Sequence, residues 1–257
     1  MARRATLIKN TRAGNENVLL LDAGNSLISE SPSDGEPAKR TRAQTSVEIL
    51  NRMGYDAVAL GPLDLLLGKA ELQKRLSEAK GFDWLSANLY EAATGKRVVK
   101  PYVIREIGSH PVALVGITGP ITGTLTGRAP EFTIGDPLQA ALETVREVQG
   151  RADIIIVLSS AGAELNKQIA AQVQGIDLIL SAGAQRLADP VEAPPGVLVA
   201  QADLSLPGHA GRTVGILKAD YDRDGHMLAY EWKAVDLSEA IGDDPASAAW
   251  VKSINQP

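Results

Sequence analysis

The chain contains no cysteine in its 257 residues. This absence excludes disulfides, thiolate metal ligands and a cysteine nucleophile. It leaves the cellular compartment open, because a core of this size needs no covalent cross-links in either redox environment. The chain also has no apolar run near the roughly 20 residues that a membrane-spanning helix requires.

A strong charge surplus is missing as well. The net charge is -5, and the 22% of charged residues mix both signs. We therefore expect neither nucleic acid nor an anionic membrane as a partner. The basic start, Met1 to Arg4, is followed by Lys9, Asn10 and Arg12, which interrupt any signal-peptide core. As given, the sequence is expected to be neither secreted nor anchored.

Short apolar runs alternate with helix-like stretches, so we expect one α/β domain over residues 1–257 with parallel strand pairing. Helices are expected at Ala43 to Met53, from Pro137 to about Gln149, and at Ala163 to Val173. The expected strands are Val18 to Ala23, Asp56 to Leu60, Asp83 to Leu89, Asp153 to Leu158, Asp177 to Leu180 and Val197 to Ala202. Several of these strands are apolar throughout, which is typical of strands covered on both faces.

Two segments interrupt the alternation and indicate hairpins. Tyr102 to Glu106 is followed by Gly108-Ser109 and Pro111 to Ile117, and Thr213 to Tyr221 is followed by His226 to Val235. The sheets should therefore be mixed, in two packed layers with helices outside. Two segments rich in turn-forming residues are expected to be loops: Ser29 to Lys39 and Val191 to Gly196.

Several motifs carry a family resemblance. They are Leu19-Leu20-Leu21-Asp22-Ala23-Gly24-Asn25, Gly54-Tyr55-Asp56-Ala57 running into Gly61-Pro62-Leu63-Asp64, Leu85-Ser86-Ala87-Asn88, Val112 to Thr118, Ala152 to Gly162 and Gly175 to Leu180. In this order, and over nearly the whole chain, they resemble the catalytic domain of the 5′-nucleotidase branch of the calcineurin-like metallophosphoesterases. The resemblance implies a four-layer α/β/β/α sandwich with mixed sheets. It also suggests, weakly, a periplasmic or extracellular location.

The same resemblance implies a site for two divalent metals, such as Mn, Zn or Fe, which would clamp a phosphate and activate a water. At the matched ligand positions this sequence has Asn25, Pro62, Leu63, Ser160, Gly183 and Gln185. None of them is a strong ligand, and neutral oxygens do not offset the repulsion between two dications. We therefore expect an inactive, pseudo-5′-nucleotidase domain without a metal cofactor, serving a binding or structural role. The alternative is a phosphohydrolase acting on nucleotides or other phosphomonoesters through a remodelled site.

A calcium-loop pattern occurs near the C-terminus. Asp220, Asp222 and Asp224, followed by Gly225 and Glu231, match the EF-hand spacing. An EF-hand needs flanking helices, whereas the flanking residues here alternate like strands. A hairpin turn is therefore the favoured interpretation, and a calcium site is the weaker one. His226, which lies in the same turn, is expected to be a solvated loop residue.

The family's first strand, which carries an Asp-x-His pair of ligands, should precede Arg3 and is not in this sequence. In the family that strand lies inside the sheet, so its absence predicts unpaired backbone groups and an apolar slot. The chain belongs to a longer polypeptide, its own N-terminus fills the slot, or a partner donates a strand. The sequence identifies no other partner.

Overall fold

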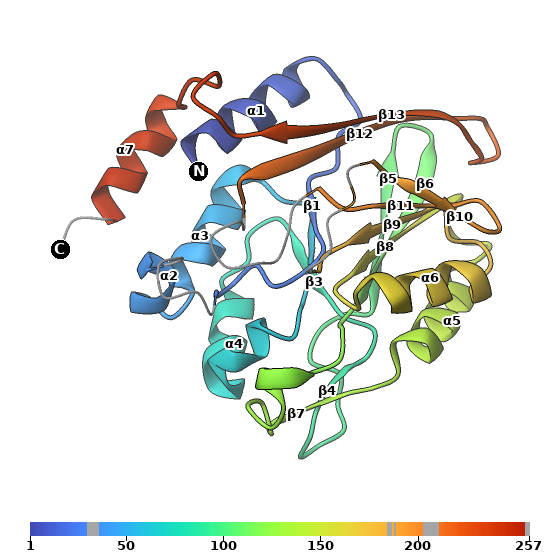
Figure 1. Cartoon of the computed structure of the whole chain (residues 1–257), viewed down its shortest axis with the longest axis horizontal. Coiled ribbons are helices and arrows are strands. Elements are labelled where there is room, and N and C mark those ends of the chain that lie inside the picture. The colour runs from blue at the N-terminus through green and yellow to red at the C-terminus, as the bar shows by residue number, and fades with distance from the viewer. Residues whose placement is uncertain (30–35, 184–186, 188, 203–210, 255–257) are drawn as a thin grey trace.

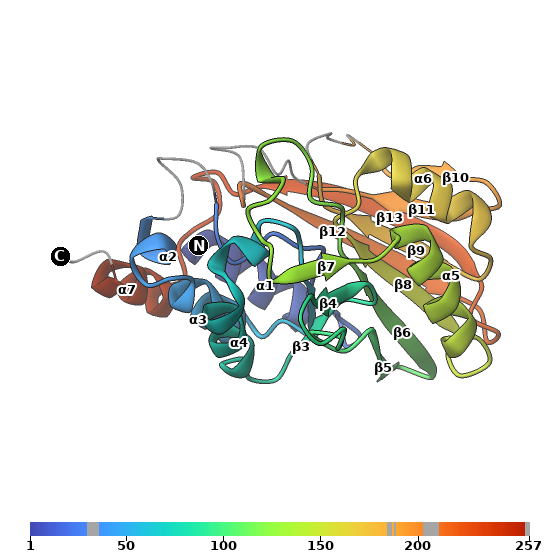
Figure 2. The ribbon, with the colours of Figure 1, turned by 90° about the horizontal axis from the view of Figure 1, so that it is seen from below.

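The computed structural model describes residues 1–29, 36–183, 187, 189–202 and 211–254. Two sheets pack face to face with helices on both outer sides (Figure 1 and Figure 2). The predicted four-layer α/β/β/α sandwich with mixed sheets is confirmed. No helix in the described part of the chain has the length and apolar character needed to cross a bilayer.

The larger sheet has the strand order β10-β11-β9-β8-β6-β5. Its strands are β5 (Tyr102–Ile107), β6 (His110–Ile117), β8 (Ile154–Ser159), β9 (Leu178–Ser181), β10 (Val191–Ala193) and β11 (Val197–Ala200). The four inner strands are parallel, and the two edge strands are antiparallel to their neighbours. Helices α5 (Pro137–Val148) and α6 (Ala163–Gln172) cover the outer face (Figure 1).

Strand β8 shows how a segment that is apolar up to its last residue, Ser159, contributes to two cores. Its residues alternate between the faces of the sheet. Ile155 and Val157 pack beneath α5 and α6, whereas Ile156 and Leu158 face the opposite sheet. Every residue of β8 is buried for this reason.

The second layer contains the parallel strands β1 (Leu21–Asp22), β2 (Ala57–Ala59) and β3 (Asp83–Leu85). Its outer face is covered by α1 (Ala2–Ala13), α3 (Gln44–Met53) and α4 (Lys69–Ser77), through Ile8, Leu50 and Leu72 among others. Helix α3 ends at Gly54, whose φ of 69° makes a left-handed cap.

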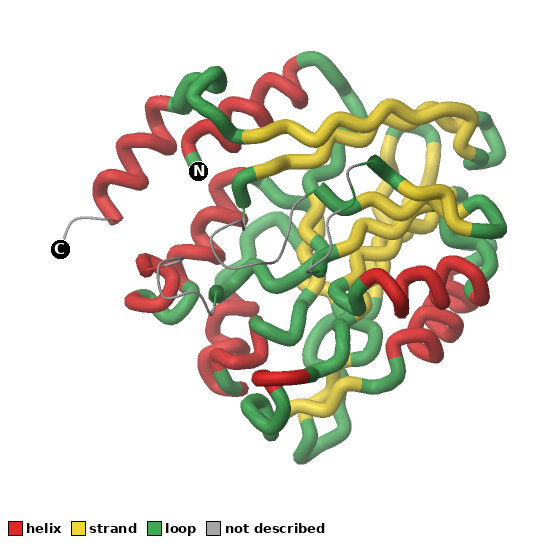
Figure 3. The backbone as a smooth tube through the Cα atoms, viewed as in Figure 1, coloured by secondary structure: helices red, strands yellow, loops and turns green. Residues whose placement is uncertain are grey.

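A long two-stranded ribbon, β12 (Thr213–Tyr221) with β13 (Met227–Asp236), continues this second layer. Leu217 and Trp232 pack against the same inter-sheet core as Ala57, Leu85 and Leu114. Among the described residues, β12 is hydrogen-bonded only to β13. Figure 3 shows the ribbon as the long yellow pair of strands near the top. Both predicted hairpins are confirmed.

The remaining elements are short or peripheral: α2 (Glu36–Arg40), the 3-10 helices Asp64–Leu67 and Gly123–Leu125, the antiparallel pair β4 (Leu89–Glu91) and β7 (Phe132–Ile134), and α7 (Pro245–Ile254). Helix α7 packs near α1, where Lys9 pairs with Asp244.

Several predicted boundaries are wrong. Asp83 to Leu89 is two strands in different sheets, because the chain turns where Ser86 and Asn88 bond Thr118. The predicted loop Val191 to Gly196 contains β10, an edge strand that needs only one partner. The predicted loop from Ser29 ends in helix α2, and its residues 30–35 lie outside the described part. Val18 to Ala23 is a strand only at Leu21–Asp22.

Candidate functional site

The turns that follow β1, β2 and β8 meet at one end of the sandwich, as expected for the carboxyl ends of parallel strands. Asn25, after β1, accepts a hydrogen bond at Oδ1 from the backbone N–H of Leu63, after β2, at 2.9 Å. A Cβ placed on Gly24 would lie 3.2 Å from the Cβ of Ser160, after β8. The structure therefore brings Asn25, Leu63 and Ser160 together, and we call this region the strand-end site.

Asn25 has a left-handed backbone with φ of 62°, a conformation that asparagine tolerates better than most residues. This conformation turns the chain closely against the loop after β2. A Cβ on Gly61 would overlap Asn25 Oδ1 and lie 2.6 Å from the Asn25 backbone nitrogen. Gly61 is thus required by a backbone-to-backbone approach, and the Asn25 amide oxygen joins two loops.

Ser160 links a third loop to the site. Its Oγ accepts a hydrogen bond from the backbone N–H of Gly119 at 3.0 Å and donates to the Ile117 carbonyl at 3.4 Å. Ser160 is also the N-terminal neighbour of the turn into α6, whose N-cap is Gly162. The hydroxyl therefore serves the connection between β6 and β8.

The last matched positions follow β9. Gln185 lies outside the described residues. Gly183 uses its carbonyl to accept a hydrogen bond from Gln201 Nε2 at 3.0 Å. Gln201 also belongs to a buried chain of hydrogen bonds that runs through Ser181 and Asn166 to Ser159, with distances of 2.9, 2.9 and 2.6 Å. Sequence reasoning did not identify this chain, although Asn166 and Gln201 stand out as polar residues in apolar segments.

Two carboxylates beside the strand-end site were also missed. Asp64 is 0% exposed, and its two oxygens accept backbone N–H groups of Gly61, Leu27 and Asn25 at 2.8, 2.9 and 3.1 Å. Burial raises the pKa of Asp64 to about 7, although these three donors act in the opposite direction. Burial likewise raises the pKa of Asp22, which accepts a hydrogen bond from Gly24. In the sequence analysis, Asp22 and Asp64 are only part of the motifs that carry the family resemblance.

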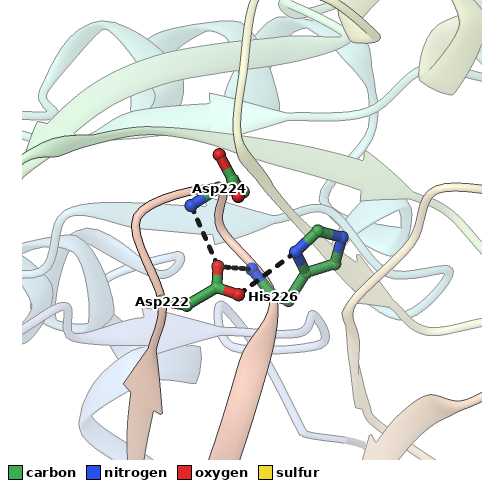
Figure 4. Close-up of side chains that lie close together, drawn as sticks. All are labelled: Asp222, Asp224 and His226. Carbon is green, nitrogen blue, oxygen red and sulfur yellow. Dashed lines mark hydrogen bonds and ion pairs between the residues drawn. The ribbon is translucent and has the colours of Figure 1, made fainter.

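The calcium-loop pattern forms the tip of the β12–β13 ribbon. Asp222 Oδ1 accepts the backbone N–H groups of Asp224 and His226 at 2.9 Å each, and Oδ2 lies 3.4 Å from His226 Nδ1 (Figure 4). These backbone hydrogen bonds lower the pKa of Asp222. Asp220 and Glu231 instead lie within the strands, opposite Ala229 and Lys218. The favoured hairpin is confirmed, and the turn gathers Asp222 and Asp224 with His226.

Comparisons with known proteins place these features in context. No family model matches the chain. The bovine 5′-nucleotidase is 26% identical over 264 residues, which cover 95% of this chain and 45% of that protein. The structure of a 5′-nucleotidase precursor from Thermus thermophilus superposes with a TM-score of 0.85 at 27% identity, covering 100% of this chain and 52% of that one.

A calcineurin-like phosphoesterase from Bacillus subtilis, YfkN, has the same fold, with a TM-score of 0.81 at 20% identity over 100% of this chain and 88% of that one. The chain spans about half the length of the 5′-nucleotidases it matches.

Proposed function

Because the chain belongs to the 5′-nucleotidase branch of the calcineurin-like phosphoesterases, we propose that it is a non-catalytic member with a binding or structural role. One observation carries this proposal. The described positions matched to metal ligands hold Asn25, Pro62, Leu63, Ser160 and Gly183, none of which carries a charge.

The donor atoms at these positions do not fit two dications. Neighbouring dications repel one another and require a bridging carboxylate with further anionic or imidazole ligands. Here Asn25 Oδ1 and Ser160 Oγ each already accept a backbone N–H. The side chains of Pro62, Leu63 and Gly183 offer no ligand atom. The site oxygens support loop packing instead of metal binding.

The alternative, a metal-dependent phosphohydrolase with a remodelled site, is favoured by one observation. Asp22 and Asp64 place two carboxylates beside the strand-end site, near enough that Asp22 raises the pKa of Asp64. Both Asp64 oxygens accept backbone N–H groups, however, and the side chain is fully buried. Asp64 is therefore a poor metal ligand.

Metal analysis and an activity assay distinguish the two. The chain is purified with manganese, its metal content is measured, and hydrolysis of p-nitrophenyl phosphate and AMP is followed. We expect substoichiometric metal and no turnover above the buffer blank. Stoichiometric metal with turnover, both lost in Asp22→Asn and retained in the control Glu239→Gln at an exposed position, would reverse the proposal.

We also propose that the protein works outside the cytoplasm. The support is the matched Thermus thermophilus protein, which is described as a precursor. Fractionation of the producing cells checks this location, and recovery of the protein solely with cytoplasmic markers would refute it.

A further inference from the structure

The outer strand of the ribbon, β13, ends the second layer on the side away from β1 (Figure 1). It has 10 residues, whereas the outer strands β5 and β10 of the larger sheet have 6 and 3. Among the described strands, β13 pairs only with β12. A long strand with one open edge is a template for pairing with another strand.

The register shows which backbone groups of β13 point away from β12. The Leu237 N–H donates to the carbonyl of Arg212 opposite it at 2.8 Å, and every second pair along the ribbon shares this hydrogen-bonded geometry. The residues between them direct their N–H and C=O groups outward, and they include Tyr230, Trp232 and Ala234. No described residue bonds the outward groups of these three.

The side chains along this edge are open to solvent. Leu228 and Tyr230 are 68% and 43% exposed, and among the large apolar side chains of the described residues only Val191 is comparably exposed. Glu231 and Lys233 lie on the other face of the strand, because successive residues alternate between faces, and both are exposed. The edge of β13 therefore offers backbone groups, apolar surface and both signs of charge.

The outward groups restrict how two copies of β13 can pair. Copies related by a two-fold axis pair in an antiparallel way, and outward residues of one copy must lie opposite outward residues of the other. With Trp232 at the axis, Trp232 lies opposite its own copy and Tyr230 lies opposite Ala234. Each of these pairs then exchanges both of its N–H···O bonds.

The charges select this register over its neighbours. With Trp232 at the axis, Glu231 of each copy lies opposite Lys233 of the other. Moving the axis by one residue in either direction instead places Glu231 or Lys233 opposite its own copy. Opposite charges across a strand pair stabilise the pair, whereas like charges directly opposite destabilise it. Strand β13 is therefore complementary to itself in this register.

We propose that two copies of this chain associate through β13, antiparallel about a two-fold axis at Trp232, so that the second layer continues from one copy into the other. The pairing gives the outward backbone groups their partners and sets Tyr230 beside the small side chain of Ala234. The contact is one strand wide and smaller than a standard protein interface, so we expect a dissociation constant in the micromolar range.

A strand from a different polypeptide is the competing occupant. Pairing with an unlike strand would not require the charge order of β13 to match itself. A lysine on an edge strand normally discourages pairing, but here the charge of Lys233 is answered by Glu231 of the second copy. The proposal is also independent of the lack of catalysis, since it uses no residue of the strand-end site.

Sedimentation of the whole chain from micromolar to millimolar concentration measures the association, and we expect a monomer–dimer equilibrium. Glu231→Lys and Lys233→Glu each replace both opposite-charge pairs by like-charge pairs, so each should weaken dimerisation at least about tenfold. The control Glu106→Lys makes the same charge change at an exposed position of the outer strand β5. Its dissociation constant should stay within about twofold of that of the parent chain.

Two further measurements separate the interface from an effect on folding. Glu231 also lies opposite Lys218 within the ribbon, so Glu231→Lys adds repulsion inside one copy as well. The double variant, Glu231→Lys with Lys233→Glu, keeps that internal repulsion but restores opposite charges across the axis, and it should dimerise as the parent chain does. An equimolar mixture of the two single variants should form a heterodimer, because one variant then presents two lysines to two glutamates of the other.

Three results would overturn the proposal. A chain that stays monomeric up to millimolar concentration has no such interface. A dimer that Glu231→Lys does not weaken, or that Glu106→Lys weakens equally, is held together by another surface. A mixture of the two single variants that remains monomeric would contradict the register.

Discussion

At the scale of single residues, the loops of the strand-end site are held together by internal hydrogen bonds. Asn25 and Ser160 hold loops together through their oxygens, and Asp64 gathers three backbone N–H groups from two loops. A buried carboxylate with several donors is a strong organiser of local structure. Asp64 is therefore the residue on which the geometry of these loops depends most.

Titration of Asp64 should make the free energy of unfolding depend on pH. Its folded pKa, near 7, lies above the value of 3.8 expected when unfolded, so the folded state binds more protons between these values. The stabilising contribution is fully present below about pH 4 and is lost as pH rises through about 7, by a few kcal/mol. Urea denaturation between pH 4 and 8 measures this trend.

Asp64→Asn should remove that part of the pH dependence. It should also destabilise the fold by about 2 kcal/mol, because an amide cannot accept all three N–H groups. Asp224→Asn, in the exposed ribbon turn, is the matched control and should leave the pH profile unchanged. A profile that is identical in Asp64→Asn and the parent chain would contradict the assignment.

At the scale of elements, the sequence predicted the larger sheet better than the second layer. Strand β8 is apolar from Ile154 to Leu158 because it contributes to two cores. The helix predicted from Pro137 is α5, where the Asp136 side chain accepts the N–H of Gln139. Helix α1 was missed as an element, because its polar residues far outnumber its three buried ones, Ala2, Ala5 and Ile8.

The candidate site was predicted in its positions but not in its contacts. The strand-end motifs correctly brought Asn25, Leu63 and Ser160 together. The roles of Asp64 and Gln201 could not be predicted from the sequence, because the hydrogen-bond partners of a buried polar group can lie far from it along the chain. Hydrogen bonds from the Leu27 N–H to Asp64 and from Ser181 to Gln201 join different elements, and residue spacing does not encode them.

The close packing of the loops after β1 and β2 predicts a sharp glycine requirement. Gly61→Ala would force its Cβ into Asn25, so we expect destabilisation by about 3 kcal/mol from overpacking. Gly242→Ala is the control, since no atom lies within 4 Å of a Cβ there. Thermal denaturation compares the two, and equal melting temperatures would show that the loops separate easily.

At the scale of the whole molecule, the ribbon should be less stable than the larger sheet. It shares side-chain packing with the inter-sheet core but is hydrogen-bonded to no other described strand. The amides of Ile216 and Lys233, which pair across the ribbon, should therefore exchange through an opening that leaves β6 and β8 intact. Isolated hairpins are marginal without further strands.

Native-state hydrogen exchange at increasing denaturant measures this difference. We expect Ile216 and Lys233 to open at a free energy lower by about 2 kcal/mol or more than Leu114 and Ile156. If all four amides exchange with the free energy of global unfolding, the ribbon is fully cooperative with the rest of the fold.

The buried chain of hydrogen bonds from Ser159 through Asn166 and Ser181 to Gln201 also limits which substitutions this sequence can accept during evolution. Each side chain in this set is a hydrogen-bond partner of the next. Replacing one of them by an apolar residue would therefore leave a buried polar group without its partner. Related sequences should therefore either keep the whole set or exchange its members jointly, and this coordinated change would mark descendants of the same ancestral architecture.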